Sequence, residues 1–417
     1  MSRLPRGTAP RSSFVIVALL SLRALAGEPD CSAITRGNVV ACALGGSALL
    51  AAELGSSRAA EGRVEAARPF LPSNPVVTGS LGTRNGGGSR ATNWSVTLAQ
   101  ELEIAGQSGL RVDTAHGELE AQRHQVAVVR ADVAEQVWLA YFEALAARER
   151  AALAARIERA SRAVSLTVQG MAAQGLASSL EAAVADAAAV RASKTRLEAE
   201  RDRGAGELRL RSVLGAPVTA EVAGTLEPLR VSAEAGAARP ERLALEALER
   251  ASARRVELLR RSRAPNPTLS LFAQNDGFDE KVFGVGLGIP IPLPQPVGRT
   301  RAGEIAEAAG LEARLRAELE QVSRRIDSEQ ALARVTWDTS VQARALYSPE
   351  RLESARAGLT AIAEQLAAAR IPVREALVSQ QALVELLQAE VEARHELCVA
   401  SVRLVRATGG SLEGGAL

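Results

Sequence analysis

A long internal repeat constrains the fold of this chain more than any other feature. Residues 71–75, Leu-Pro-Ser-Asn-Pro, precede two short stretches of alternating apolar and polar residues and then a tract rich in Ala, Glu and Arg. Residues 264–267, Ala-Pro-Asn-Pro, open the same series in the second part of the chain. Solenoid repeats are only about 20 to 50 residues long, so this unit is too long to be one. The series predicts a duplicated half-molecule, each half contributing two strands and a long helical hairpin.

Composition supports a mainly α fold with a small β part. Ala, Leu, Glu and Arg dominate the 417 residues, aromatic residues make up 3%, and Arg largely replaces Lys. This mixture is typical of long helices and coiled coils.

The N-terminus has the organisation of a secretory signal peptide. Three arginines precede an apolar segment at residues 14–22, which is too short to span a bilayer as a helix, and Ala24-Leu25-Ala26 fits the small-x-small cleavage rule. Residues 1–26 are therefore predicted to be removed. Their loss takes four of the 50 basic residues and no acid, leaving 46 against 48 acidic. No basic surplus remains, and we expect no nucleic-acid partner.

Three cysteines, Cys31, Cys42 and Cys398, would remain after cleavage. An odd number in an exported chain leaves at least one thiol outside intramolecular disulfides. We interpret Cys42 and Cys398 as small apolar packing residues. Lipid attachment at Cys42 and a disulfide between Cys31 and Cys42 both stay open.

The first repeat is predicted over residues 27–215. Apolar spacing indicates a helix over 32–70, ended by Pro69 and Pro72. The strand pair occupies 75–104, and the helical hairpin 107–214 has a long helix over 107–170, a break near 174–177 and a returning helix over 178–214. Residues 216–238 carry Pro and Gly and are predicted to be an irregular linker.

The second repeat, residues 239–410, is predicted to follow the same order. A helix precedes the strand pair 267–293, and the hairpin 299–408 has a continuous helix over 299–367, a break at 370–373 and a return over 374–408. Residues 411–417 form a tail.

The strands alternate in a way that suits a membrane. In the second repeat, large apolar residues alternate with Gly284, Gly286 and Gly288, although glycine weakens a strand. A strand of a membrane barrel, with lipid on one side and a crowded or water-filled interior on the other, tolerates that pattern. The predicted lipid-facing residues are Trp94, Val96, Leu98, Phe283, Val285, Leu287 and Ile289.

Four strands cannot close a barrel, and open strand edges do not occur in lipid. Several chains must therefore combine. Three chains would supply twelve strands, an even number that matches outer-membrane barrels. The long helices would form a second, helical tube beside the barrel.

Several short motifs of the chain resemble those of a known family. The matching features are the Pro-Ser-Asn-Pro and Ala-Pro-Asn-Pro strand openers, the run at 289–293 followed by Gly298-Arg299, Tyr347-Ser348-Pro349, and the stretch 376–409 with Gln380, Leu383, Ala389 and Glu390. Over residues 32–410 they are similar to the TolC family of outer-membrane efflux proteins, and within it to the CzcC-like branch of heavy-metal pumps.

The resemblance implies a trimeric α-barrel and β-barrel duct in the outer membrane of a Gram-negative bacterium, with a large periplasmic part. Such ducts are passive exits, here expected for metal cations, that a periplasmic adaptor (membrane fusion protein) connects to an inner-membrane pump of the resistance-nodulation-division type. The adaptor-docking tips correspond to Gln174, Gly175, Leu176, Ala177, Ser178, Arg370, Ile371, Pro372 and Val373. Members usually have Gly at the start of each tip, and Arg370 departs from that pattern.

Three alternatives accompany this interpretation: a duct for drugs or secreted polypeptides, a soluble periplasmic coiled-coil adaptor or scaffold, and an exported enzyme. We find no catalytic motif and predict no enzyme activity, no cofactor and no metal site. His116 and His124 lie two helical turns apart, and His395 with Cys398 supplies only two ligands. Trp138, with its aromatic neighbours Tyr141 and Phe142, is interpreted as packing between helices.

Overall fold

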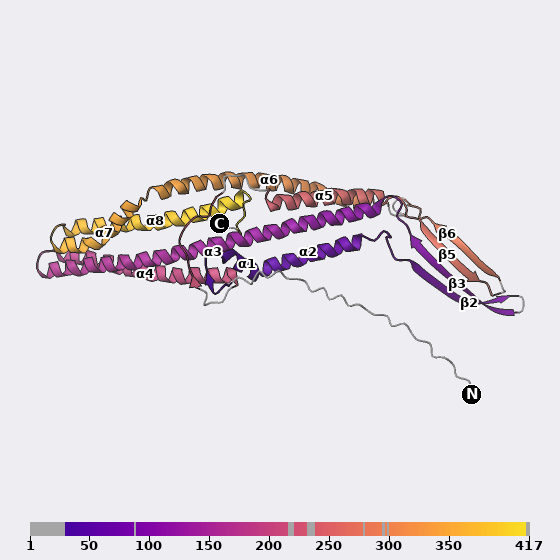
Figure 1. Cartoon of the computed structure of the whole chain (residues 1–417), viewed down its shortest axis with the longest axis horizontal. Coiled ribbons are helices and arrows are strands. Elements are labelled where there is room, and N and C mark those ends of the chain that lie inside the picture. Colours follow the sequence, from indigo (N-terminus) through magenta and orange to yellow (C-terminus); the bar gives the residue numbers. More distant parts are fainter. Residues whose placement is uncertain are drawn as a thin grey trace, which may run out of the picture.

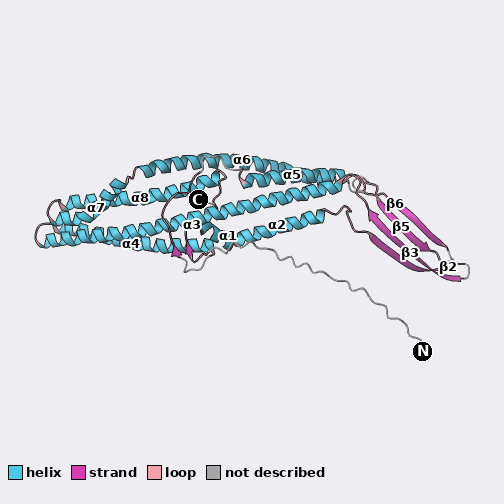
Figure 2. Ribbon diagram, viewed as in Figure 1, coloured by secondary structure: helices cyan, strands magenta, loops and turns pink. Residues whose placement is uncertain are grey.

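The computed structural model describes residues 30–86, 89–215, 221–231, 238–277, 280–293, 297 and 300–413. The predicted signal peptide and residues 414–417 lie outside them. The molecule is long and narrow, with a small sheet at one end and helical turns at the other (Figure 1). Figure 2 shows that helices make up most of its length.

The N-terminal part is more divided than the predicted single helix over 32–70. It contains β1 (Ala33–Ile34), α1 (Val39–Gly46) and α2 (Ala48–Ala67). The prediction of one helix was wrong because Ser47 is extended, and its hydroxyl caps α2 by accepting from the Leu50 amide at 3.2 Å. Among the described helices, none is long and apolar enough alone to cross a membrane, and only the bent pair α1–α2 passes that test by length and composition.

The strands β2 (Val76–Gly86), β3 (Ser89–Glu101), β5 (Thr268–Asn275) and β6 (Lys281–Gly288) form, within the described residues, a four-stranded antiparallel sheet in the order β2-β3-β5-β6. β3 and β5 join the two parts of the chain. The edge strands β2 and β6 each pair on one side only within that sheet.

The first hairpin consists of α3 (Gln107–Ala173) and α4 (Ser179–Leu214), close to the predicted bounds. The 67 residues of α3 contain no proline, so nothing interrupts a helix of roughly 100 Å. α3 contacts α1, α2, α4, α5, α7 and α8, and it is the central element of the body.

The second hairpin corrects the prediction of one continuous helix over 299–367. After α5 (Pro240–Arg261), the chain forms α6 (Ala302–Ala345), α7 (Pro349–Ala367) and α8 (Val373–Ala407). The break lies at residues 346–348, because Ser348 is extended and caps α7 while Pro349 occupies its first turn. Proline suits that position since its missing N–H has no helical partner there.

The largest core cluster lies around the middle of α3. Trp138, Tyr141 and Phe142 are fully buried, and the rings of Trp138 and Phe142 stack with centroids 5.5 Å apart. The Trp138 indole donates to the carbonyl of Leu412 at 3.0 Å, and the Tyr141 hydroxyl donates to that of Ala223 at 2.7 Å. The predicted packing role of these aromatics is confirmed. They also hold the C-terminal segment and the linker.

The linker is ordered in part. Within residues 221–231, β4 (Glu221–Val222) pairs in parallel with β1, which the sequence did not predict. Cys42 is buried in the largest core cluster, as expected of a packing residue, and the disulfide that the sequence left open is present, because Cys42 is bonded to Cys31. Cys398 is free and buried, and burial raises the pKa of its thiol to about 12.

Candidate functional site

One face of the sheet is apolar over its middle rows, and its end rows also contain Gln100, Asn275 and Lys281. Residues directly opposite in an antiparallel pair share a face, so the register places Val77, Leu98, Leu271 and Val285 in one row across all four strands. One neighbouring row on this face contains Val96, Ala273 and Phe283, and the row beyond it contains Leu81 and Trp94. Phe283 and Val285 are 76% and 68% exposed.

Of the residues predicted to face lipid, Trp94, Val96, Leu98, Phe283, Val285 and Leu287 share this face by register. Ile289 lies beyond the end of β6 and is exposed. The structure adds Val77, Leu81, Leu269 and Leu271, whose alternation in β2 and β5 is the same signal.

The opposite face is polar and carries the glycines of β6. Its rows pair Thr78 with Thr97, and Ser80 with Ser95, whose hydroxyls lie 2.8 Å apart. A Cβ at Gly284 would lie 2.3 Å from the Phe272 ring, and one at Gly286 would lie 2.5 Å from the Ser270 hydroxyl. The glycines therefore leave room for side chains of the adjacent strand, a steric reason that the sequence did not reveal.

The two tips lie together at the end opposite the sheet (Figure 1). A shared apolar cluster holds them together, including Val164 and Val168 of α3, Ile362 and Leu366 of α7, and Val373 of α8. Leu176, at the turn between α3 and α4, is 68% exposed. Ser178 caps α4 in a reciprocal pair with Glu181.

Both turns use the same hydrogen bonds. In the first, the Gly175 amide donates to Ala172 at 3.0 Å and the Leu176 amide to Met171 at 2.9 Å. In the second, Ala369 donates to Leu366 at 3.0 Å and Arg370 to Gln365 at 2.9 Å. Each is a Schellman motif, which needs a left-handed residue just after the helix.

The second tip therefore starts one residue earlier than predicted. The position equivalent to Gly175, with φ +73°, is Ala369, with φ +51°, and Arg370 is equivalent to Leu176. The sequence did not identify Ala369 because alanine carries no signal for a left-handed turn.

Between the sheet and the tips, charged groups join the helices. Arg406 of α8 donates to Asp132 of α3 at 2.6 Å and also bonds Glu241 of α5. Burial alone would raise the pKa of Glu241, but hydrogen bonds from Arg239 and Arg406 lower it to about 2. A hydrogen bond from His395 similarly lowers the pKa of Glu143 to about 2.

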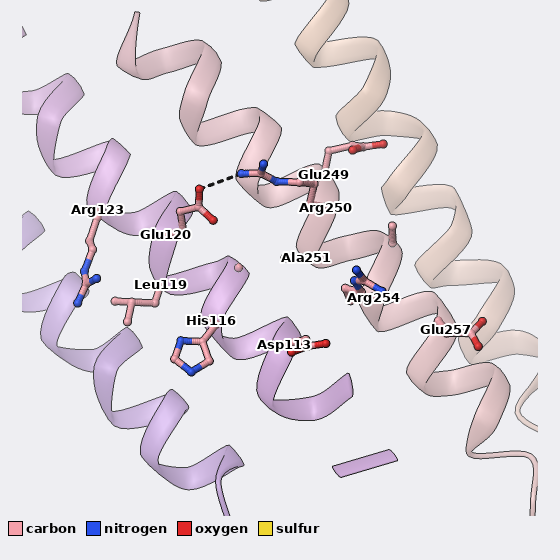
Figure 3. A pocket seen from close by; sticks show the side chains of 12 residues that line it. Asp113, His116, Leu119, Glu120, Arg123, Glu249, Arg250, Ala251, Arg254 and Glu257 are labelled. Atoms are coloured by element: carbon pink, nitrogen blue, oxygen red, sulfur yellow. Dashed lines mark hydrogen bonds and ion pairs between the residues drawn. The ribbon is translucent and has the colours of Figure 1, made fainter. Parts of the chain in front are cut away.

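A charged cavity of about 740 Å³ lies between α3 and α5. Figure 3 shows Asp113, His116 and Glu120 on α3 beside Arg250 and Arg254 on α5. Glu120 and Arg250 form an ion pair at 2.9 Å. Among the described residues, no group of three or more His, Cys, Asp or Glu side chains is arranged to hold a metal ion. The two ring nitrogens of His395, which the sequence analysis considered as a ligand, lie 3.1 Å from Glu143 and 3.2 Å from Arg150.

Known proteins share this architecture. The chain superposes on the outer-membrane channel OprN with a TM-score of 0.75 and 17% identity, covering 91% of this chain and 90% of that one. The outer membrane protein VceC of Vibrio cholerae gives 0.76 and 18% over 90% and 96% of the two chains. CusC, whose structures concern folding and transmembrane channel formation, gives 0.74 and 16% over 90% and 92%. No curated protein matches the chain by sequence.

Residues 43–216 match the sequence model of a family described as Outer membrane efflux protein. Family match and fold are those of efflux channels and not of enzymes. The chain therefore has the fold of outer-membrane channels, and its residues 43–216 carry the sequence pattern of the outer membrane efflux protein family.

Proposed function

We propose that the chain is the passive outer-membrane exit duct of a tripartite efflux system and works as a homotrimer. The observation that carries this proposal is the sheet, which combines a face that is apolar over its middle rows with two edges, β2 and β6, that lack a second neighbour in the described sheet. An unsatisfied backbone group in lipid costs several kcal/mol. Pairing β6 of one copy with β2 of the next removes both edges, and three copies make a twelve-stranded barrel.

Mass and conductance test the duct. Light scattering on the detergent-solubilised full-length chain should give about three copies per particle, and the same particles should conduct ions across a planar bilayer. The full-length chain should also fractionate with the outer membrane. A stable monomer, or recovery without detergent in the periplasmic fraction, would instead support a soluble adaptor or scaffold.

The tips are proposed to dock the periplasmic adaptor. The support is an exposed apolar side chain, Leu176, presented on a turn whose Gly175 amide and neighbours are already hydrogen-bonded. Residues 174–178 and 370–373 lie at the same end and are joined by one core cluster.

Leu176→Asp tests this docking role. The change leaves Gly175 and the backbone bonds of the turn intact while placing a charge on the exposed surface. We expect normal trimer yield and outer-membrane insertion but reduced efflux-dependent resistance, with Leu176→Gln, uncharged and of similar size, showing a smaller loss. Unchanged resistance at normal expression would assign the residue to the turn alone and move docking elsewhere.

Metal cations are the first cargo proposed, on the resemblance to the CzcC-like branch. A passive water-filled exit needs no resident metal ligand, so cargo follows from the pump. A strain lacking this chain should lose resistance to divalent metals. Loss of resistance to organic drugs only, or of polypeptide secretion, would replace the metal assignment while leaving the duct in place.

A further inference from the structure

The joint between the sheet and the helices carries its own group of exposed apolar side chains. These residues lie between the strands and the helices in the sequence, and all are exposed: Phe70, Leu71, Ile104, Ile289, Ile291, Leu293 and Val297. Soluble surfaces carry single exposed apolar residues, whereas a concentration at one level of a molecule marks a site of interaction.

This group continues the apolar face of the sheet. Val285 and Leu287 of β6 are followed at every second position by Ile289, Ile291 and Leu293, and all five are exposed. Ile291 is 80% exposed. An apolar path therefore leads from the sheet face past the end of β6.

The path ends at a cavity of about 730 Å³. Ile291 and Leu293 line it, and so do Arg263, Arg301 and Asn266, which belongs to the strand opener at residues 264–267. The cavity thus combines an apolar wall with two cationic side chains.

The charge balance of this cavity is positive. Its lining carboxylate, Glu101, accepts from Asn266 at 2.8 Å, and Arg301 lies 3.8 Å from Glu304. Arg263 is exposed and has no ion-pair partner within 4.0 Å among the described residues. Arg260, in the last turn of α5, adds further positive charge to this end of the helix, whereas Arg261 is paired with Glu257 at 2.9 Å.

We propose that this cavity binds an anionic glycerophospholipid, with its phosphate at Arg263 and Arg301 and an acyl chain along the apolar path from Ile291 to Val285. Guanidinium groups bind phosphate oxygens with good geometry, and basic pockets at a membrane surface select anionic headgroups. The apolar path favours a lipid over a free phosphate, which would gain nothing from it. The assignment rests on the proposed function, because it requires the apolar face to lie in the bilayer, and it places this lipid in the leaflet nearer the helical body.

Native mass spectrometry of the full-length chain tests the site. Bound dioleoylphosphatidylglycerol and dioleoylphosphatidylcholine are counted after titration into the same detergent. We expect the phosphatidylglycerol to bind more tightly, and Arg263→Gln to weaken it about fivefold, since one arginine near a membrane surface contributes roughly that factor. Arg301→Gln should act in the same direction.

Two control variants separate the contribution of the cationic side chains to lipid binding from that of the apolar path. Arg84→Gln removes a charge at the opposite end of the sheet, where Arg84 lies 3.5 Å from Asp276, and should leave lipid binding unchanged. Ile291→Ser should weaken both lipids, because it interrupts the apolar path but not the cation site. Millimolar inorganic phosphate should not displace the phosphatidylglycerol, and displacement would identify a phosphate site in place of a lipid site.

Equal affinity for the two lipids, or the same loss in Arg84→Gln as in Arg263→Gln, would overturn the inference. Both results leave the duct intact if the chain still inserts into bilayers and conducts. A chain that does not enter bilayers at all would overturn the proposed function, and the lipid site with it.

Discussion

The two parts of the chain build the sheet alike but the helical body differently. In the N-terminal part, α3 runs without interruption for 67 residues, whereas in the C-terminal part α6 and α7 divide that span at residues 346–348. In the sheet, β2 and β3 supply the same apolar row as β5 and β6.

The difference shows where the fold restricts sequence. A row of side chains facing lipid must be apolar in every strand, because a charge there has no compensating partner. A long helix in the body has no such requirement along its length. A cap and a proline interrupt it at little cost, provided that neighbouring helices bury the apolar stripe on both sides of the break.

The largest expected effect concerns the contact between the two parts. Arg406→Met removes a nearly buried guanidinium that bonds Asp132 of α3 and Glu241 of α5. Removing one partner of a buried ion pair costs about 3 to 5 kcal/mol. Thermal unfolding followed by circular dichroism at pH 7 should show a clearly lower Tm.

The pH dependence of that loss follows from Glu241. Its folded pKa of about 2 lies below the ordinary value of 4.5, so its ionised form stabilises the fold above pH 4.5, and this stabilisation is lost as pH falls from 4.5 towards 2. The Tm difference between Arg406→Met and the parent should therefore narrow in that window. A difference that stays constant with pH would mean that Arg406 does not stabilise the fold through the ionised form of Glu241.

The next prediction tests whether the strands from the two parts of the chain tolerate a charge in the apolar row equally. Val285→Arg in β6 and Val77→Arg in β2 place a charge in the same apolar row. Each should hinder assembly in the membrane by about 2 to 4 kcal/mol if the row lies near mid-bilayer depth. The yield of folded trimer in outer-membrane fractions measures it.

Gly286→Ser is the matched control on the polar face of the sheet. Its new Cβ meets only the Ser270 hydroxyl, the end of a side chain that can rotate, so assembly should change little. Equal yields for Val285→Arg and Gly286→Ser would contradict a membrane strand, and a loss confined to Val285→Arg without one in Val77→Arg would show that the row is not equivalent across the sheet.

Sequence alone predicted the features that depend on periodicity. The strands, the bounds of α3 and α4 and the apolar residues of β3 and β6 follow from patterns of two and 3.6 residues, which backbone geometry imposes directly. The break at residues 346–348 was missed, although Ser348-Pro349 is a start signal for a helix, because the apolar pattern continues across it.

Features that depend on tertiary proximity were beyond the sequence. The Cys31–Cys42 disulfide was left open because spacing does not fix a pairing, and the cavity near Arg263 joins residues from the turn after α5, the strand opener and the segment after β6. Ala369 was missed for a local reason, since its left-handed conformation is imposed by the hydrogen bonds of the turn and not favoured by alanine itself.

The smallest expected effect concerns the left-handed residue of each tip. Exchanging alanine and glycine there should change the stability of the two turns in opposite directions. A left-handed conformation costs a non-glycine residue about 1 to 2 kcal/mol, while replacing alanine by glycine costs about 0.4 to 1 kcal/mol through the unfolded chain. Ala369→Gly should therefore stabilise its turn by about 0.5 to 1 kcal/mol. Gly175→Ala should destabilise its turn by a similar amount through the backbone alone, because an added Cβ meets nothing within 4 Å.

Hydrogen exchange of the Arg370 and Leu176 amides, which close the two turns, reports each effect locally. Exchange at Arg370 should slow in Ala369→Gly, and exchange at Leu176 should accelerate in Gly175→Ala. If Ala369→Gly instead accelerated exchange at Arg370, the second turn would not carry the left-handed strain, and the equivalence of Ala369 with Gly175 would fail.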